Sequence, residues 1–273
     1  MLNARSPGIF FLGVQKMITT SYRPSEHTIK TAKQLSKELN MPYCGRNKQT
    51  VEHLLKSAER DLLVVGKERF ELYTKQGAKF FFHPNTAMFR AKRFLQGEKE
   101  PMLRAAGLSE GDTFLDCTLG LGSDAIIASM AVGETGSVVG IEKNHLVSVL
   151  VRTGLHSWET GIEELQAAMR RIQVKNGDCF EHIKQLPDNS VDVVYFDPMF
   201  HEPVETSDGI APLRDLAEDS VLHEGCINEA VRVARKSVVL KDHWKSPRFE
   251  QFGFNVMKRK TALFHYGVIQ TSP

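Results

Sequence analysis

From residue 101 onward, short runs of apolar residues alternate with segments whose apolar positions repeat every three or four residues. The runs are typical of buried strands, and the repeating pattern is typical of helices that cover a sheet. We expect strands at residues 113–118, 137–142, 172–176, 191–197 and 236–241, and helices at 123–131, 145–153, 162–171 and 222–234, with a shorter one near 179–185. This alternation predicts an α/β domain whose parallel sheet is covered on both faces.

The two ends of the chain follow different patterns. Apolar runs at residues 254–260 and 262–269 predict an antiparallel hairpin at the sheet edge. The first hundred residues predict a small α/β module, with a strand at 18–21, helices at 25–40, 50–58 and 87–95, and short strands at 61–65, 69–73 and 78–82. We therefore divide the chain into a dispensable extension (1–16), an N-terminal basic module (17–100) and a larger domain (101–273).

Acidic residues stand at the ends of four strands predicted in the larger domain. They are Asp116, Glu142, Asp178 and Asp197. In open α/β sheets, ligands bind outside the carboxyl ends of the strands, near the switch in strand order. We therefore expect these four carboxylates to line one pocket.

A glycine-rich turn with Gly120 and Gly122 follows the first of these strands. Glycines let the backbone approach a ligand closely, and the next helix offers free N–H groups. Glu142 lies 20 residues past Gly122, a spacing that fits a carboxylate holding ribose hydroxyls. The turn also matches a loose dinucleotide pattern, but Asp116 suits a cationic ligand better than a pyrophosphate. A sulfonium cofactor that carries adenosine satisfies both features, because it has a ribose for Glu142 and a positive charge for Asp116.

The segment Asp197-Pro198-Met199-Phe200 follows an apolar run at 191–196. A carboxylate and the carbonyl held by the proline can accept both N–H bonds of an exocyclic amine, and the aromatic ring can stack on the attached base. The alternative is a plain turn, because Asp-Pro commonly begins one. The glycine-rich turn upstream favours the amine-binding interpretation.

With these motifs the chain resembles class I S-adenosylmethionine-dependent methyltransferases, and within that class the bacterial 16S rRNA guanine-N2 methyltransferase family. The resemblance runs from about residue 78 to the end and is carried by residues 116–125, 140–143, 178–179, 193–200 and 238–241. The family usually has Arg where this chain has Ser123, and Pro-His where it has His201-Glu202. The resemblance implies a Rossmann-like methyltransferase fold, with a mostly parallel seven-stranded sheet and a C-terminal antiparallel hairpin.

The resemblance also implies the cofactor and the site. S-adenosylmethionine would be the methyl donor and S-adenosylhomocysteine the product, with Glu142 on the ribose and Asp178 on the adenine amine. The expected cofactor-binding residues are Asp116, Gly120, Gly122, Ser123, Asp124, Glu142, Lys143, Asp178 and Cys179. Catalysis would fall to Asp197, Pro198, Met199 and Phe200, in a one-step methyl transfer to an exocyclic amine of a nucleobase, guanine N2 in small-subunit rRNA. Methylation of adenine N6 or of a protein Gln or Asn amide remains open, as does an inactive protein that binds the cofactor or RNA.

Charge is distributed unevenly along the chain. Residues 1–100 carry 18 Lys and Arg against 9 Asp and Glu, whereas residues 101–273 carry 17 against 24. A basic front half joined to an acidic domain favours a polyanionic partner. The family resemblance implies that this partner is RNA, in the form of rRNA or the small ribosomal subunit. The expected substrate contacts are Arg90, Lys92 and Arg93 on the helix at 87–95, together with Lys241. An exposed helix with ordinary solvated cations explains the first three equally well.

The remaining composition excludes several classes of protein. The four cysteines lie far apart with no zinc spacing, so we expect reduced thiols and no metal. No apolar run reaches the roughly 18–20 residues that a membrane span needs. These features favour a cytoplasmic enzyme that does not bind membranes, and they leave the oligomeric state undetermined.

Overall fold

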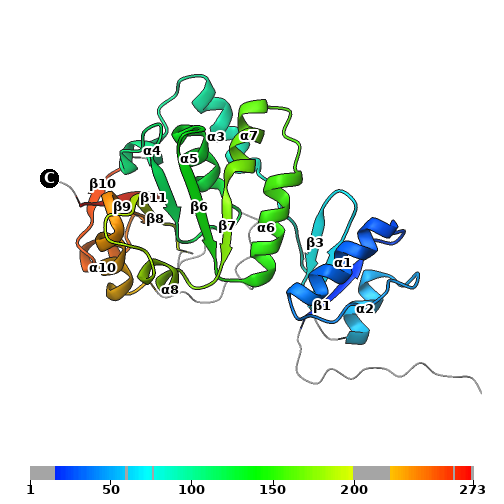
Figure 1. The fold of residues 1–273 in the computed structure, drawn as a ribbon. Coiled ribbons are helices and arrows are strands. Elements are labelled where there is room, and N and C mark those ends of the chain that lie inside the picture. The colour runs from blue at the N-terminus through cyan, green and yellow to red at the C-terminus, as the bar shows by residue number, and fades with distance from the viewer. Residues whose placement is uncertain (1–15, 59–60, 76, 199–221, 261, 272–273) are drawn as a thin grey trace, which may run out of the picture. The chain divides into compact units, whose positions relative to one another are not determined.

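The protein forms two compact units, of which the first ends at Phe81 and the second begins at Phe82. A computed structural model describes residues 16–58, 61–75, 77–198, 222–260 and 262–271 (Figure 1). Residues 1–15 of the expected extension therefore lie outside the described residues. The sequence placed the boundary after residue 100, whereas the structure assigns the helix expected at 87–95 to the second unit.

The N-terminal unit is a four-stranded sheet with two helices. The sheet order is β1-β2-β3-β4, and only the pair β1–β2 is parallel. Its elements are β1 (Lys16–Thr20), α1 (Glu26–Glu38), α2 (Val51–Ala58), β2 (Asp61–Val65), β3 (Phe70–Tyr73) and β4 (Lys79–Phe80). Ser25 caps α1 by accepting a hydrogen bond from the Thr28 backbone N–H, as the sequence predicts for this residue type.

The C-terminal unit contains the predicted seven-stranded sheet, in the order β10-β11-β9-β8-β5-β6-β7. Its strands are β5 (Thr113–Asp116), β6 (Ser137–Glu142), β7 (Gln173–Asn176), β8 (Val191–Phe196), β9 (Ala234–His243), β10 (Asn255–Met257) and β11 (Phe264–Gln270). The strands from β5 to β9 pair in parallel, and β11 is antiparallel to both β9 and β10. The predicted parallel sheet and terminal hairpin are both confirmed.

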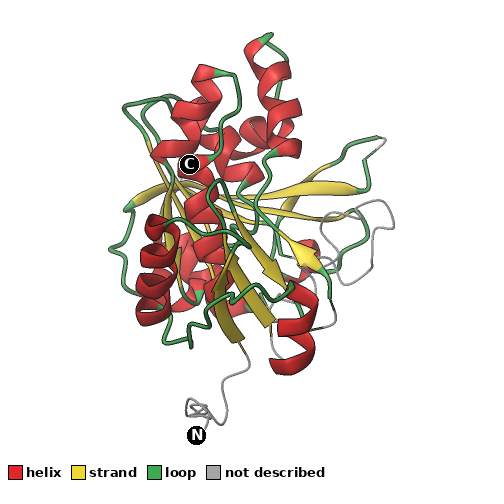
Figure 2. Ribbon diagram, turned by 90° about the vertical axis from the view of Figure 1, so that its right-hand side faces the viewer, coloured by secondary structure: helices red, strands yellow, loops and turns green. Residues whose placement is uncertain are grey.

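Helices cover both faces of this sheet (Figure 2). They are α3 (Asn85–Leu95), α4 (Pro101–Ala106), α5 (Ser123–Val132), α6 (His145–Ser157), α7 (Glu163–Arg171), α8 (Cys179–Lys184), α10 (Glu224–Val233) and α11 (Arg248–Gln251). On one face, Val194 and Phe196 of β8 pack in a cluster with Ile183 of α8 and Ile227 of α10. Tyr195, between them in the chain, faces the other way and donates its hydroxyl hydrogen to a carboxylate of α5.

Two short helices, α4 and α11, were not expected from the sequence. The signals for α4 are present, because Pro101 occupies its first turn and Gly107 closes it with a left-handed backbone at φ 63°. Six helical residues are too few for a periodic apolar pattern to stand out. None of the helices in the described part of the chain combines the length and apolar character that crossing a membrane would require.

Candidate active site

The order of the strands determines where the candidate site lies. Strands β5, β6 and β7 follow one another outward, and the chain then returns to add β8 on the other side of β5. This switch point lies between β5 and β8, where the register pairs Asp116 with Tyr195. Ligands of open α/β sheets bind at the carboxyl ends of strands beside such a point. Asp116 ends β5 and Asp197 follows β8, so two of the expected carboxylates meet there.

The glycine-rich turn after β5 has the backbone that glycine favours. Gly120 and Gly122 have positive φ values of 49° and 73°, and Gly122 immediately precedes α5. The side chain of Leu119 folds over Gly140 of β6, where even a methyl group would overlap it. The absence of a side chain at Gly140 therefore lets the turn lie against the ends of the strands.

Glu142, at the end of β6, is held in place by two backbone groups. Its Oε2 accepts a hydrogen bond from the Gly120 N–H (3.1 Å), and its Oε1 accepts one from the Asn144 N–H (2.8 Å). The geometry therefore joins this residue to the glycine-rich turn, as a ribose-binding role requires.

A small cavity lies beside the same strand ends. Asp178 caps α8 by accepting a hydrogen bond from the Phe180 N–H (3.0 Å), and Lys143 approaches it to 3.6 Å. The lining residues come from segments that follow four different strands: Thr118, Lys143, Asp178, Cys179, Phe180, Phe196, Pro198, Leu222, His223 and Cys226. The cavity thus combines an aromatic ring with hydrogen-bonding groups, which is the composition expected for a nucleobase site.

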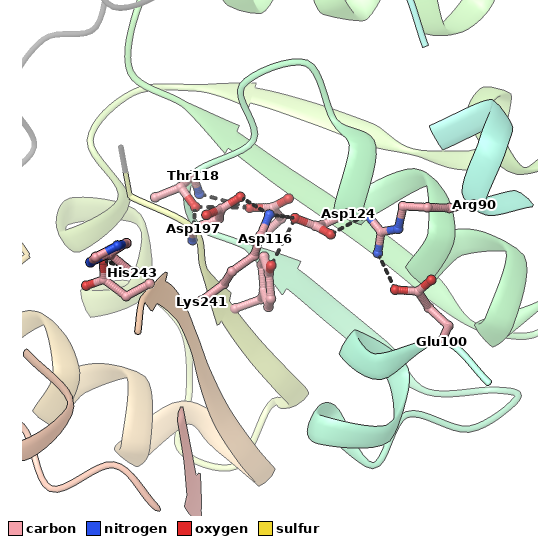
Figure 3. Close-up of polar contacts among 10 residues, drawn as sticks. Arg90, Glu100, Asp116, Thr118, Asp124, Asp197, Lys241 and His243 are labelled. Carbon is pink, nitrogen blue, oxygen red and sulfur yellow. Dashed lines mark hydrogen bonds and ion pairs between the residues drawn. The ribbon is translucent and has the colours of Figure 1, made fainter. Parts of the chain in front are cut away.

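Thr118 and Lys241 hold Asp197 from two sides (Figure 3). The Asp197 backbone N–H donates to Thr118 Oγ1 (2.6 Å), and the Thr118 N–H donates to Asp116 Oδ1 (3.0 Å). Lys241 Nζ, from β9, lies 2.6 Å from Asp197 Oδ2 and 3.1 Å from Asp124 Oδ2. The sequence predicted Lys241 to contact substrate, whereas the structure engages it with two carboxylates of the site.

A second set of contacts joins α3 to this cluster. Arg90 donates to Asp124 Oδ1 (2.6 Å) and to Glu100 Oε1 (2.7 Å), and its side chain is 17% exposed. Tyr195 donates to Asp124 Oδ2 (2.9 Å), so both oxygens of Asp124 are occupied. The expectation that Arg90 contacts RNA phosphate therefore conflicts with its geometry, because its donors are directed at carboxylates inside the unit.

The other expected cations on α3 lie apart from the cluster. Arg93 forms an exposed ion pair with Glu98, and Lys92 is exposed. Met199 and Phe200 lie outside the described residues. The roles assigned to the expected site residues therefore stay predictions, although the structure brings the four strand-end acids to one edge of the sheet.

The surroundings of the cluster shift the pKa values of its three carboxyl groups in different directions. Burial raises the pKa of Asp116 well above its usual value, and the charges of Asp124 and Asp197 add to this effect. Burial also raises the pKa of Asp197, to about 6, with Asp124 acting in the same direction and Lys241 opposing it. For Asp124, the charges of Lys241 and Arg90 overcome the effect of burial and lower the pKa.

Thr118 and Tyr195 are the supporting residues that sequence reasoning missed. A signal existed for Tyr195, because side chains two residues apart on a strand share a face and Asp197 follows it at that interval. For Thr118, the one signal in the sequence was its place in the turn after Asp116, which does not indicate that its hydroxyl accepts a hydrogen bond from Asp197. Among the residues that the structure describes, no group of three or more His, Cys, Asp or Glu is arranged to hold a metal ion.

Comparisons with known proteins agree with this geometry. A family model described as "Putative SAM-dependent methyltransferase" matches residues 47–262, beginning well before the resemblance found in the sequence. Relatives named ribosomal RNA small subunit methyltransferase J come from Hydrogenovibrio crunogenus (29% identity over 57% of this chain and 57% of the relative) and Vibrio campbellii (30% identity over 66% and 74%). The match to the first therefore spans little more than half of that relative's length.

The fold has a counterpart among solved structures. A crystal structure of a SAM-dependent methyltransferase from Neisseria gonorrhoeae superposes with a TM-score of 0.61 at 17% identity, covering 93% of this chain and 95% of that one. At this level of identity the likeness establishes the architecture alone.

Proposed function

Because this chain belongs to the family of S-adenosylmethionine-dependent methyltransferases, we propose that it methylates an exocyclic amine of small-subunit rRNA, and that this amine is guanine N2. The observation that carries the proposal is the position of Asp197-Pro198. This pair follows β8 at the switch point, held by Thr118 and Lys241, and Pro198 lines the cavity at the strand ends.

The residues present fit the cofactor that the family uses. Glu142, tied to the turn at Gly120, would hold the ribose hydroxyls, and Asp178 beside Phe180 would hold the adenine amine. Asp116 offers a buried carboxyl whose pKa is raised by burial and by the charges of Asp124 and Asp197. The cofactor supplies an electrophilic methyl group on a sulfonium, and a cation near Asp116 would favour ionisation of that carboxyl.

The work of the protein at the target amine is to orient it and to stabilise charge. An exocyclic amine is a weak nucleophile because its lone pair is delocalised into the ring. Asp197 and the Pro198 carbonyl would accept its two N–H bonds and stabilise the positive charge that develops on nitrogen. Lys241 opposes protonation of Asp197 and so keeps it an acceptor near neutral pH. Alignment of the reactants can contribute up to about 7–11 kcal/mol.

The substrate class rests on the relatives. The proteins from Hydrogenovibrio and Vibrio are named as methyltransferases of small-subunit ribosomal RNA. The choice of guanine N2 rests on the sequence resemblance and on a site that can accept two N–H bonds from one amine. Phe200 would stack on the extracted base.

The test is nucleoside mass spectrometry of small-subunit rRNA from cells with and without the gene. We expect N2-methylguanosine to disappear on deletion and to return with the wild-type protein. With purified protein, Asp197→Ala should lower the rate of transfer by about 10²–10³. Asp188→Ala, which removes an exposed carboxylate paired with Arg232, is the control. Loss of N6-methyladenosine, or methyl transfer to protein amides, would assign a different amine and contradict the proposal.

A further inference from the structure

Arg46, in the N-terminal unit, is a buried cation that forms no ion pair with any residue in the described part of the chain. The residue is 9% exposed, and its Nε and Nη1 are fully buried with no hydrogen-bond partner. Among the described residues, Tyr73 is the one ionisable group that acts on it, and the Tyr73 hydroxyl donates to Glu71. Burying an unpaired charge is costly, so such groups are normally paired or hydrogen-bonded.

The local backbone presents this guanidinium at a tight turn. The Gln49 N–H donates to the Arg46 carbonyl (2.9 Å), and the two residues between them, Asn47 and Lys48, have positive φ values of 44° and 61°. Lys48 is exposed. The turn therefore carries a second cation close in sequence to a guanidinium that lacks acceptors.

The ligand that suits this arrangement is an oxyanion. Guanidinium donors match the oxygens of a phosphate in a fork geometry and form charge-assisted hydrogen bonds with them. Residues 16–81 carry 13 Lys and Arg against 7 Asp and Glu, so the unit as a whole attracts anions. On α1, Lys30, Lys33 and Lys37 are all exposed and add to this charge.

We propose that Arg46 binds a backbone phosphate of the RNA substrate, an inference that rests on the proposed function. Nε and Nη1 are closed to solvent in the free protein, so the Arg46 side chain would turn outward on binding, and the phosphate would then supply the acceptors that the folded chain lacks. Contacts to phosphate position a nucleic acid without reading its sequence. Arg46 would therefore contribute to RNA affinity and leave the chemistry of methyl transfer unchanged.

The test compares Arg46→Met with Lys56→Met in the full-length protein. Methionine keeps the apolar stem of Arg46 and removes the charge. Lys56 is an exposed lysine of the same unit, paired with Glu52, so its removal reports the general effect of one lost cation. The measurements are the affinity for a small-subunit rRNA fragment at several salt concentrations, kcat and KM for RNA in methyl transfer, and thermal stability.

We expect Arg46→Met to weaken RNA binding about tenfold and to lower the slope of log affinity against log salt by about one. Its KM for RNA should rise while kcat and the affinity for S-adenosylmethionine stay the same, and its thermal stability should hold or increase. Lys56→Met should change RNA affinity about twofold or less. If the methionine protein does not fold, Arg46→Lys, which keeps the charge and loses the fork, should weaken binding about threefold.

Two failures can be told apart. Wild-type protein that neither binds nor methylates rRNA would refute the proposed function. If the wild type binds RNA but Arg46→Met weakens binding no more than Lys56→Met does, the phosphate site alone is refuted. If the methionine protein does not fold, an Arg46→Lys protein with unchanged RNA affinity would refute it in the same way. An affinity loss that comes with a matching loss of thermal stability would also overturn it, because a structural role predicts that combination.

Discussion

Replacing Lys241 with methionine tests whether the charge on this residue sets the ionisation of Asp197. Lys241 Nζ lies 2.6 Å from Asp197 Oδ2, and its side chain is 16% exposed. An opposite charge at such a distance lowers a carboxyl pKa by about 1–3 units. Without Lys241, the pKa of Asp197 should therefore rise from about 6 to about 7–9.

A higher pKa of Asp197 should shift the acid limb of the pH profile of methyl transfer to higher pH. If Asp197 binds the target amine as proposed, the rate should rise with pH as Asp197 ionises, because the protonated carboxyl is a poorer acceptor for an amine N–H and carries no charge. A midpoint near pH 8 would leave roughly one-tenth of Asp197 ionised at pH 7, against roughly nine-tenths in the wild type, a loss of about tenfold or 1.4 kcal/mol. Raising the pH to about 9.5 should restore most of the rate.

The assay is the initial rate of labelled methyl transfer to rRNA between about pH 5.5 and 9.5, expressed as kcat/KM. Lys241→Arg keeps the positive charge and should leave the midpoint near the wild-type value. Lys236→Met removes a lysine from the same strand that pairs with Asp112 at 2.6 Å, and it controls for the loss of one ion pair. An unchanged midpoint in Lys241→Met, or a rate loss equal at every pH, would refute the reasoning.

Two further predictions concern the framework of the site. Arg90→Met should destabilise the protein by about 3–5 kcal/mol in urea unfolding, because it leaves Asp124 short of one partner in a buried pair. Arg93→Met, in an exposed pair on the same helix, should have no measurable effect, and equal effects would contradict the assignment. Gly140→Ala should lower the affinity for S-adenosylmethionine about tenfold in calorimetry, because the methyl group displaces Leu119 and with it the glycine-rich turn. Unaltered affinity would mean that the turn does not border the cofactor.

Much of the site's location could be predicted from the sequence. Parallel strands place all their carboxyl ends at one edge, so acids after successive strands must gather there. The prediction for Asp116 and Asp197 needed only the strand assignments, and the register confirms that β5 and β8 are neighbours. The terminal hairpin was predictable for a similar reason, because two apolar runs separated by a short polar stretch can pair locally.

The charge network could not be predicted. Arg90 and Asp124 lie 34 residues apart, and Lys241 and Asp124 lie 117 apart, so no local periodicity connects them. The spacing of Arg90 and Arg93 indicated a shared exposed face, but tertiary packing of α3 turned only Arg90 inward. Lys241 pairs with Asp124 and Asp197 because the strand order places β9 beside β8, and the sequence alone does not reveal that order.

Among the described residues, each unit includes a buried ionisable group whose charged form is disfavoured by burial, and the two groups have opposite charge. In the C-terminal unit, Asp116 has a raised pKa because burial and two neighbouring carboxylates oppose its ionisation. In the N-terminal unit, Arg46 has two buried nitrogens without acceptors. Both arrangements cost stability, and a protein keeps such a cost where a ligand relieves it. A sulfonium cation would relieve the first and a phosphate the second, so the two anomalies together match a cationic methyl donor and a polyanionic substrate.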